Sequence, residues 1–117
     1  MTITKGTTRI VILIGSFAIK IPNFTNGWDL FLTGLLCNQQ EKVFSRTGWK
    51  ELCPVIFAVP GGWFNVMIRA RPLTEEEWSG FDYEGFVSRK DGRVPAENKR
   101  CSFGVVMERN IVAVDYG

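Results

Sequence analysis

The tripeptide Pro60-Gly61-Gly62 lies between two runs of strand-forming residues, 55–59 and 63–69. Both runs are rich in β-branched and aromatic side chains, which favour extended backbone, whereas proline and glycine favour a tight connection. A short loop of this kind between two such runs is typical of a β-hairpin. The sequence therefore predicts two adjacent antiparallel strands in the middle of the chain.

Two further hairpins are expected, one on each side of this one. Residues 7–14 and 17–21 are apolar and rich in β-branched residues, and Gly15-Ser16 separates them. Near the end of the chain, residues 103–107 and 111–114 repeat the pattern around a polar turn at 108–110. Because each pair is joined by only a few residues, both are expected to be antiparallel.

One main helix is predicted over residues 27–46, between the first two hairpins. Asn26 supplies an N-cap and Asp29 the acid of a capping box, and apolar residues follow at helical spacing. Gly48 is placed to end the helix. Gly34 inside the helix costs about 1 kcal/mol relative to alanine, which a close approach of helix and sheet could offset.

A shorter helix is expected after Pro72-Leu73. Thr74 and Glu77 have the spacing of a second capping box, and the helix would run toward Phe86. Residues 88–95 are polar and basic and are expected to form a loop.

These elements predict an α+β fold in which a small antiparallel sheet of hairpins packs on one main helix. The chain of 117 residues suits a single domain, 1–117, and its four Trp and nine Phe can fill a core. Each of the four tryptophans is expected to pack in the core or between helix and sheet. No apolar run approaches the roughly 20 residues of a membrane-spanning helix.

The composition excludes several classes of chemistry. The sequence contains no histidine, so catalytic Ser-His-Asp and Cys-His pairs cannot form. Its net charge of +2 gives no strong attraction to nucleic acid or to anionic membranes. Cys37, Cys53 and Cys101 are odd in number and widely spaced, and we interpret them as buried thiols of a protein in a reducing, cytoplasmic compartment.

Two segments resemble landmarks of the protein kinase fold. Residues 17–20, Phe-Ala-Ile-Lys, are similar to the V-A-I-K strand, and Glu41 follows Lys20 by 21 residues on the predicted helix. Asp115-Tyr116-Gly117 is similar to the D-F-G triplet and directly follows a predicted strand. In kinases the lysine contacts the ATP phosphates and pairs with the helical glutamate, and the aspartate binds magnesium.

A third segment, 97–102, lies where the kinase catalytic loop would be. Glu97 stands at the position of the catalytic base and Ser102 at that of the magnesium-binding asparagine. The resemblance thus implies that Lys20, Glu41 and Asp115 form a cofactor site for ATP and Mg²⁺, with Asp115 and Ser102 as metal ligands and Glu97 as a weak base. It also implies an N-lobe-like part at 7–73, a vestigial part at 74–117, and a hinge at 69–72 where adenine would bind.

The sequence also departs from the kinase pattern. Gly15-Ser16 is too short for a glycine-rich loop over a triphosphate, and no activation segment follows Asp115-Tyr116-Gly117 in these residues. We therefore expect a non-catalytic, pseudokinase-like protein without a bound cofactor. In size the chain also resembles small phage proteins, which implies an interaction or inhibitor protein that binds a host protein.

Two alternatives remain open. A minimal phosphotransferase would use Lys20, Glu41 and Asp115 to bind nucleotide. A nucleic-acid-binding module would use the basic loop 89–100, with Trp63 or Phe64 as stacking platforms. The cations of that loop are Arg89, Lys90, Arg93, Lys99 and Arg100. A homodimer could form by pairing of an exposed sheet edge.

Overall fold

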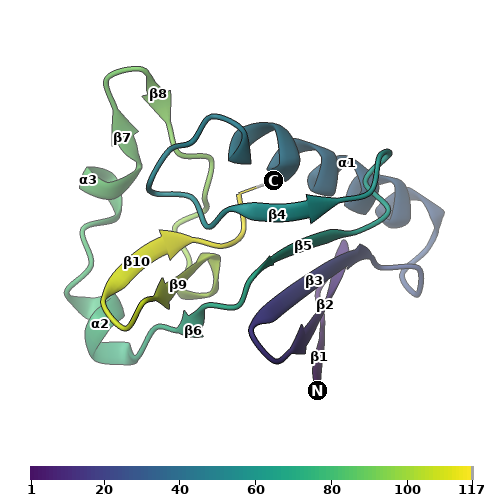
Figure 1. Ribbon diagram of the computed structural model, residues 1–117, viewed down its shortest axis with the longest axis horizontal. Helices are drawn as coiled ribbons and strands as arrows, with labels where there is room; N and C mark the ends of the chain where they lie inside the picture. The colour runs from purple at the N-terminus through teal and green to yellow at the C-terminus, as the bar shows by residue number, and fades with distance from the viewer. Residues whose placement is uncertain (117) are drawn as a thin grey trace.

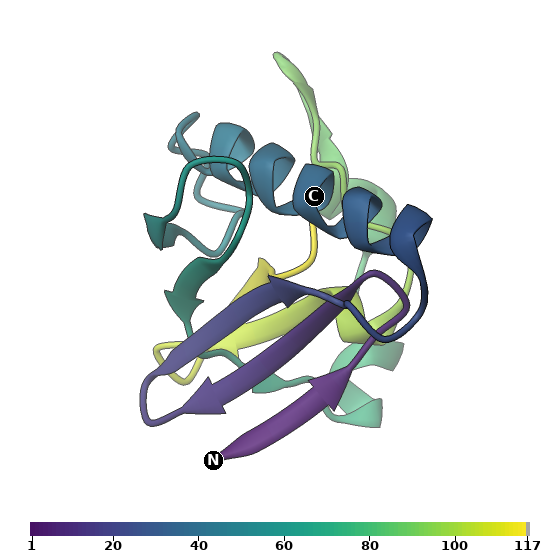
Figure 2. The ribbon, with the colours of Figure 1, turned by 90° about the vertical axis from the view of Figure 1, so that its right-hand side faces the viewer.

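The computed structural model describes residues 1–116 and has the α+β architecture expected from the sequence. Its larger sheet has five antiparallel strands in the order β1-β2-β3-β5-β4, and helix α1 lies across one face of it (Figures 1 and 2). The elements of this part are β1 (Thr2–Lys5), β2 (Arg9–Ile14), β3 (Phe17–Pro22), α1 (Trp28–Ser45), β4 (Val55–Ala58) and β5 (Asn65–Ile68).

Both predicted hairpins of this sheet are confirmed. β2 pairs with β3 around Gly15, which has a φ of 53°, and β4 pairs with β5 around Gly61 and Gly62, with φ of 90° and 82°. Gly62 also lies against the helix, since a Cβ there would be 2.1 Å from the carbonyl oxygen of Leu35. The β4–β5 loop is therefore held against α1. Strand β1, which the sequence analysis did not predict, adds an edge strand beside β2.

Helix α1 begins as predicted to within a residue, but its predicted cap is wrong. Gly27, with a φ of 101°, occupies the N-cap position, and no side chain caps the helix. The Asn26 side chain instead donates to the carbonyl of Thr7 at 3.1 Å. Gly34 permits the close approach expected of it, because a Cβ there would lie 2.2 Å from the carbonyl oxygen of Thr8.

The segment after β5 differs from prediction in two places. The expected single helix is two, α2 (Glu75–Ser79) and α3 (Tyr83–Val87), because Asp82 caps a new helix by accepting from the N–H of Gly85 at 3.1 Å. The expected polar loop contains a short hairpin, β7 (Ser88–Arg89) and β8 (Gly92–Arg93). The capping box of Thr74 and Glu77 is confirmed.

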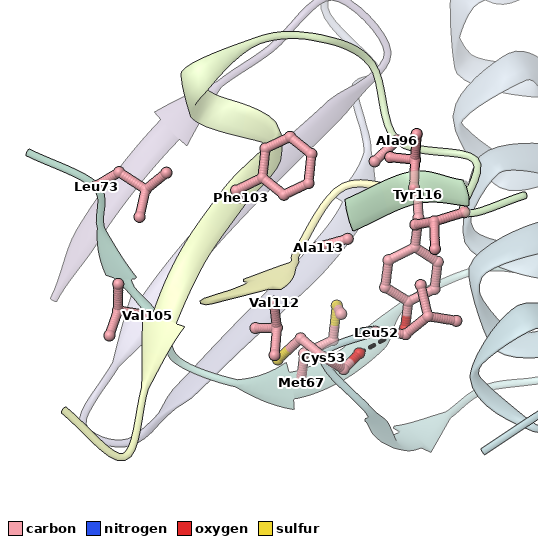
Figure 3. Packing of buried hydrophobic residues seen from close by; sticks show 12 residues of the cluster. Leu52, Cys53, Met67, Leu73, Ala96, Phe103, Val105, Val112, Ala113 and Tyr116 are labelled. Atoms are coloured by element: carbon pink, nitrogen blue, oxygen red, sulfur yellow. Dashed lines mark hydrogen bonds between the residues drawn. The ribbon is translucent and has the colours of Figure 1, made fainter. Parts of the chain in front are cut away.

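A second sheet, in the order β10-β9-β6, completes the fold and lies beside the larger sheet (Figure 1). It contains the predicted last hairpin, and its elements are β6 (Arg71–Pro72), the 3-10 turn η1 (Arg100–Ser102), β9 (Phe103–Val106) and β10 (Asn110–Ala113). A parallel bridge between Leu52 and Ala113 joins this sheet to the loop that follows α1. Figure 3 shows the core between these parts, which includes Cys53, Met67, Phe103 and Tyr116.

The two faces of α1 are reversed relative to an ordinary amphipathic helix. Its buried residues are Gly34, Asn38 and Glu41, which are polar or lack a side chain. Its exposed residues include large apolar ones: Trp28, Leu32, Leu36 and Val43. The fully buried positions of α1 therefore make polar contacts, whereas several large apolar residues of the helix are exposed.

The predicted burial of the tryptophans and cysteines is only partly correct. Trp49 and Trp78 pack against the core, but Trp28 is 70% exposed and Trp63 is 54% exposed. All three cysteines are free thiols, of which Cys53 is buried, Cys37 is half-buried and Cys101 is exposed. Within residues 1–116, no helix combines the length and apolar character needed to cross a membrane.

Candidate functional site

Lys20 and Glu41 form a buried ion pair between the larger sheet and α1. Alternation along β3 points Lys20 toward the helix, and Glu41 lies on the buried face of α1. The Lys20 Nζ donates to Glu41 Oε2 at 2.9 Å and to Oε1 at 3.2 Å. The Lys20 side chain is only 7% exposed and that of Glu41 is fully buried. The structure thus brings together the first two residues that the sequence singled out.

The end of the chain closes over this ion pair. Lys20 Nζ also donates to the main-chain carbonyl of Val114, and the N–H of Tyr116 donates to Glu41 Oε2 at 3.2 Å. The Tyr116 hydroxyl donates to the carbonyl of Cys53 at 2.5 Å and so anchors the segment in the core (Figure 3). Residues 114–116 therefore occupy the space beside Lys20 and Glu41; Gly117, the last of the D-F-G-like triplet, lies outside the described residues.

Arg9 is the central residue that the sequence analysis missed. Its guanidinium pairs with Glu41 Oε1 at 2.7 Å and also pairs with the carboxylate of Asp115. Arg9 lies on β2 two positions before Val11, the cross-strand partner of Lys20, so alternation directs both cations to the same face of the sheet. The centre therefore contains two cations and two carboxylates, of which only Asp115 is half exposed, at 53%.

Two buried asparagines hold the charged groups in place. Asn38 Oδ1 accepts from Arg9 at 3.2 Å, while its Nδ2 donates to the carbonyls of Lys20 and Gly62 at 3.1 and 2.9 Å. Asn65 donates to the main-chain carbonyl of Asn38 at 2.9 Å. These amides tie together β2, β3, α1 and the β4–β5 loop, so the three elements that carry Arg9, Lys20 and Glu41 are fixed relative to one another.

The environment shifts the pKa values of these groups for identifiable reasons. Burial lowers the pKa of Lys20, and the attraction of Glu41 offsets this only in part. Burial also disfavours ionised Glu41, but Lys20 and Arg9 together hold its pKa below the ordinary value. Nearby, burial raises the pKa of Cys53 to about 11, so this thiol stays protonated at neutral pH. Glu41 is therefore a permanent carboxylate under physiological conditions.

The side chains of the two remaining residues of the predicted site take no part in the ion pairs of this centre. Glu97 is exposed and pairs with Lys99 at 2.7 Å. Ser102 is buried, and its main-chain carbonyl accepts from the N–H groups of Val114 and Asp115 at 2.9 and 3.3 Å. Across residues 1–116, no cluster of three or more acidic or cysteine side chains has metal-binding geometry.

Most cations of the basic loop are paired with carboxylates. Arg89 contacts Glu51 at 2.5 Å and Asp91 at 2.9 Å. The other pairs are Arg93 with Glu84, Lys99 with Glu97, and Arg100 with Glu75. The predicted stacking residue Trp63 lies next to Phe31 of α1, with ring centroids 5.9 Å apart.

A large hollow of the described surface lies away from the charged centre. It is a groove of about 1150 Å³ between the loop after α1 and the smaller sheet, and Arg69 and Arg71 of the predicted hinge line it. A smaller hollow of about 400 Å³ lies beside β1 and the segment before α1. Neither is lined by Lys20, Glu41 or Asp115. Comparisons with family models, curated proteins and solved structures found no match for this chain.

Proposed function

We propose that this protein is a non-catalytic, kinase-like interaction module that acts by binding another protein. The observation that carries the proposal is the use of every donor of Lys20. Its ammonium group has three N–H donors, and it contacts both oxygens of Glu41 and the carbonyl of Val114. A phosphate would have to displace one of these buried contacts. The carboxylate of Asp115, which a metal ion would need, is paired with Arg9.

The exposed apolar surface supports a binding role. Trp28, Leu32 and Leu36 follow one another at four-residue spacing on the outer face of α1, and Leu36 is 53% exposed. Trp28 stacks on Phe31 with ring centroids 5.4 Å apart, so the aromatic part of this surface is ordered before a partner arrives. Large exposed apolar patches on soluble proteins mark interaction sites. Pre-ordered aromatic side chains lower the entropy cost of binding.

Nucleotide binding remains the second candidate, because Lys20, Glu41 and residues 114–116 meet at one place. Isothermal titration calorimetry with about 1 mM MgATP, a concentration that detects even weak binding, separates the two candidates. We expect no binding heat. Micromolar binding that Lys20→Ala and Asp115→Ala both abolish would overturn the non-catalytic proposal.

The binding role is tested by pull-down from an extract of the native cell, quantified by mass spectrometry. The bait variant Leu32→Glu/Leu36→Glu changes the outer face of α1, and Lys42→Glu alters charge at a half-buried position of the same helix. We expect at least one protein to bind both the natural sequence and the Lys42→Glu bait. The same protein should fail to bind the Leu32→Glu/Leu36→Glu bait. Retention of the same proteins by all three baits would contradict a role for this face.

A further inference from the structure

The groove beside the smaller sheet contains an unpaired strand edge. β10 is the outer strand of that sheet, and its free side faces the loop that follows α1 (Figure 1). At Ala113 this loop completes the pairing: the N–H of Ala113 donates to the carbonyl of Glu51 at 2.7 Å, and the N–H of Cys53 donates to the carbonyl of Ala113 at 2.9 Å. Ala113 therefore directs both of its main-chain groups away from β9.

Ile111 must direct its main-chain groups to the same side. In an antiparallel ladder, alternate residues point to opposite edges, and the pairing of β10 with β9 is regular from Asn110 to Ala113. The next residue, Val114, donates inward to Ser102 at 2.9 Å, which agrees with this alternation. Within residues 1–116, no hydrogen bond joins Ile111 to the loop. Its N–H and C=O therefore face the groove, which Ile111 itself lines.

The walls of the groove are apolar and its rim is positively charged. Leu52, Ile68 and Phe86 contribute apolar surface. Lys50, Arg69 and Arg109 also line the groove, and in the described part of the chain none of these three forms an ion pair. The carboxylate of Glu51 is neutralised by Arg89 at 2.5 Å. The groove therefore combines a free strand edge, apolar contacts and excess positive charge.

We propose that this groove binds an extended acidic peptide segment, which pairs with the free edge of β10 at Ile111. Main-chain hydrogen bonds to a sheet edge supply affinity, and alternate side chains of the ligand contact the groove, as in other cases of strand addition. The apolar side chains of the ligand would enter the groove and its carboxylates would meet the rim. None of Trp28, Leu32 and Leu36 lines the groove, so this site is separate from the outer face of α1.

The probe is a fluorescein-labelled peptide, acetyl-Glu-Val-Asp-Val-Glu-Val-Asp-amide, titrated by fluorescence anisotropy. Because only one residue of the edge is free, we expect a dissociation constant on the order of 100 μM. We expect the double variant Lys50→Glu/Arg109→Glu to weaken binding about tenfold or more, as two repulsive contacts would. The matched control, Lys5→Glu/Lys90→Glu, makes the same change of charge outside the groove and should bind normally.

Strand pairing is tested separately from charge. Ile111→Pro removes the N–H that faces the groove. In the register of β10 with β9, this N–H points away from β9, so the substitution removes no hydrogen bond between the two strands. If that variant fails to fold, the same question is answered with a probe that is N-methylated at its central valine, which cannot donate to the edge. We expect either change to abolish binding, and the Ile111 amide of the natural sequence to gain protection from hydrogen exchange when the probe binds.

Three results would overturn the proposal. These are no binding at about 1 mM probe, equal loss of affinity in both charge variants, and undiminished binding of the N-methylated probe. None of these results concerns nucleotide binding or the outer face of α1. The proposed function is therefore tested independently of this groove.

Discussion

Replacing Glu41 by glutamine removes the carboxylate on which the buried charges depend. Glu41 lies 2.7 Å from Arg9 and 2.9 Å from Lys20, and its side chain is fully buried. In Glu41→Gln the two cations face one carboxylate, Asp115, which contacts only Arg9. Lys20 would keep only uncharged acceptors, the carbonyl of Val114 and the amide oxygen of the new side chain. Glutamine and glutamate have nearly the same size. The loss in free energy of unfolding is therefore expected to be electrostatic.

The expected cost is large relative to the stability of a small domain. Breaking a buried ion pair by removing one partner destabilises proteins by about 3–5 kcal/mol. Small proteins lose about 2 kcal/mol of unfolding free energy per molar urea, so the urea midpoint should fall by roughly 2 M. Urea denaturation followed by tryptophan fluorescence measures this directly. Glu84→Gln, which removes an exposed partner of Arg93, is the matched control and should leave the midpoint nearly unchanged.

A second variant tests whether the loss of stability comes from an unpaired buried charge or from disturbed packing around position 41. Lys20→Met/Glu41→Gln removes one cation together with the carboxylate, so Arg9 and Asp115 remain as a balanced pair. We expect this double variant to be less destabilised than the sum of its single changes, because each single change leaves an uncompensated buried charge. Additive costs, or a midpoint for Glu41→Gln close to that of Glu84→Gln, would refute the account of the centre as one coupled network.

Three further predictions concern packing, anchoring and pH. Gly34→Ala should lower the melting temperature despite the better helix propensity of alanine, because its Cβ would be 2.2 Å from the carbonyl oxygen of Thr8. Tyr116→Phe should cost about 1–3 kcal/mol in urea denaturation, because the carbonyl of Cys53 loses its buried donor. The depressed pKa of Glu41 stabilises the fold above the unfolded-state value of about 4.3, and this contribution is lost as pH falls through the folded-state value. Urea midpoints measured from pH 7 downward should therefore fall in acid, and less steeply in Glu41→Gln.

The sequence was sufficient to predict the hairpins and α1, because these depend on local patterns. Strand alternation, turn residues and helical spacing act over a few positions, and the predicted turns at Gly15 and Gly61 are confirmed. The break between α2 and α3 was also local and could have been found, since Asp82 precedes Gly85 with the spacing of an N-cap. The prediction of Asn26 as the N-cap of α1 was wrong because the Asn26 side chain donates a hydrogen bond to the carbonyl of Thr7. Thr7 is distant in the sequence, so no local pattern reveals this contact.

The charged centre was only half predictable for a related reason. The separation of Lys20 and Glu41 in the sequence matched the spacing of the lysine and glutamate in the kinase pattern. Arg9 matched no such pattern, and its sequence position did not distinguish it from the other cations. Its role depends on the pairing of β2 with β3, which places Arg9 and Lys20 on one face, and on the approach of Asp115 from the far end of the chain. Contacts between residues 106 positions apart depend on the whole fold. Once the β2–β3 register is known, alternation alone identifies Arg9.

The reversed faces of α1 follow from the position of these charges. A helix that packs over buried Arg9 and Lys20 must present groups that compensate them, and Asn38 and Glu41 do so on its inward face. Phe44 packs against the core, but the fully buried residues of α1 are Gly34, Asn38 and Glu41, whereas most helices in proteins are stabilised by burying an apolar stripe. The polar contacts and the close approach at Gly34 therefore contribute much of the attachment of α1. The apolar residues of the outer face are thus not needed to attach the helix to the sheet, so their exposure is explained better by a partner than by folding.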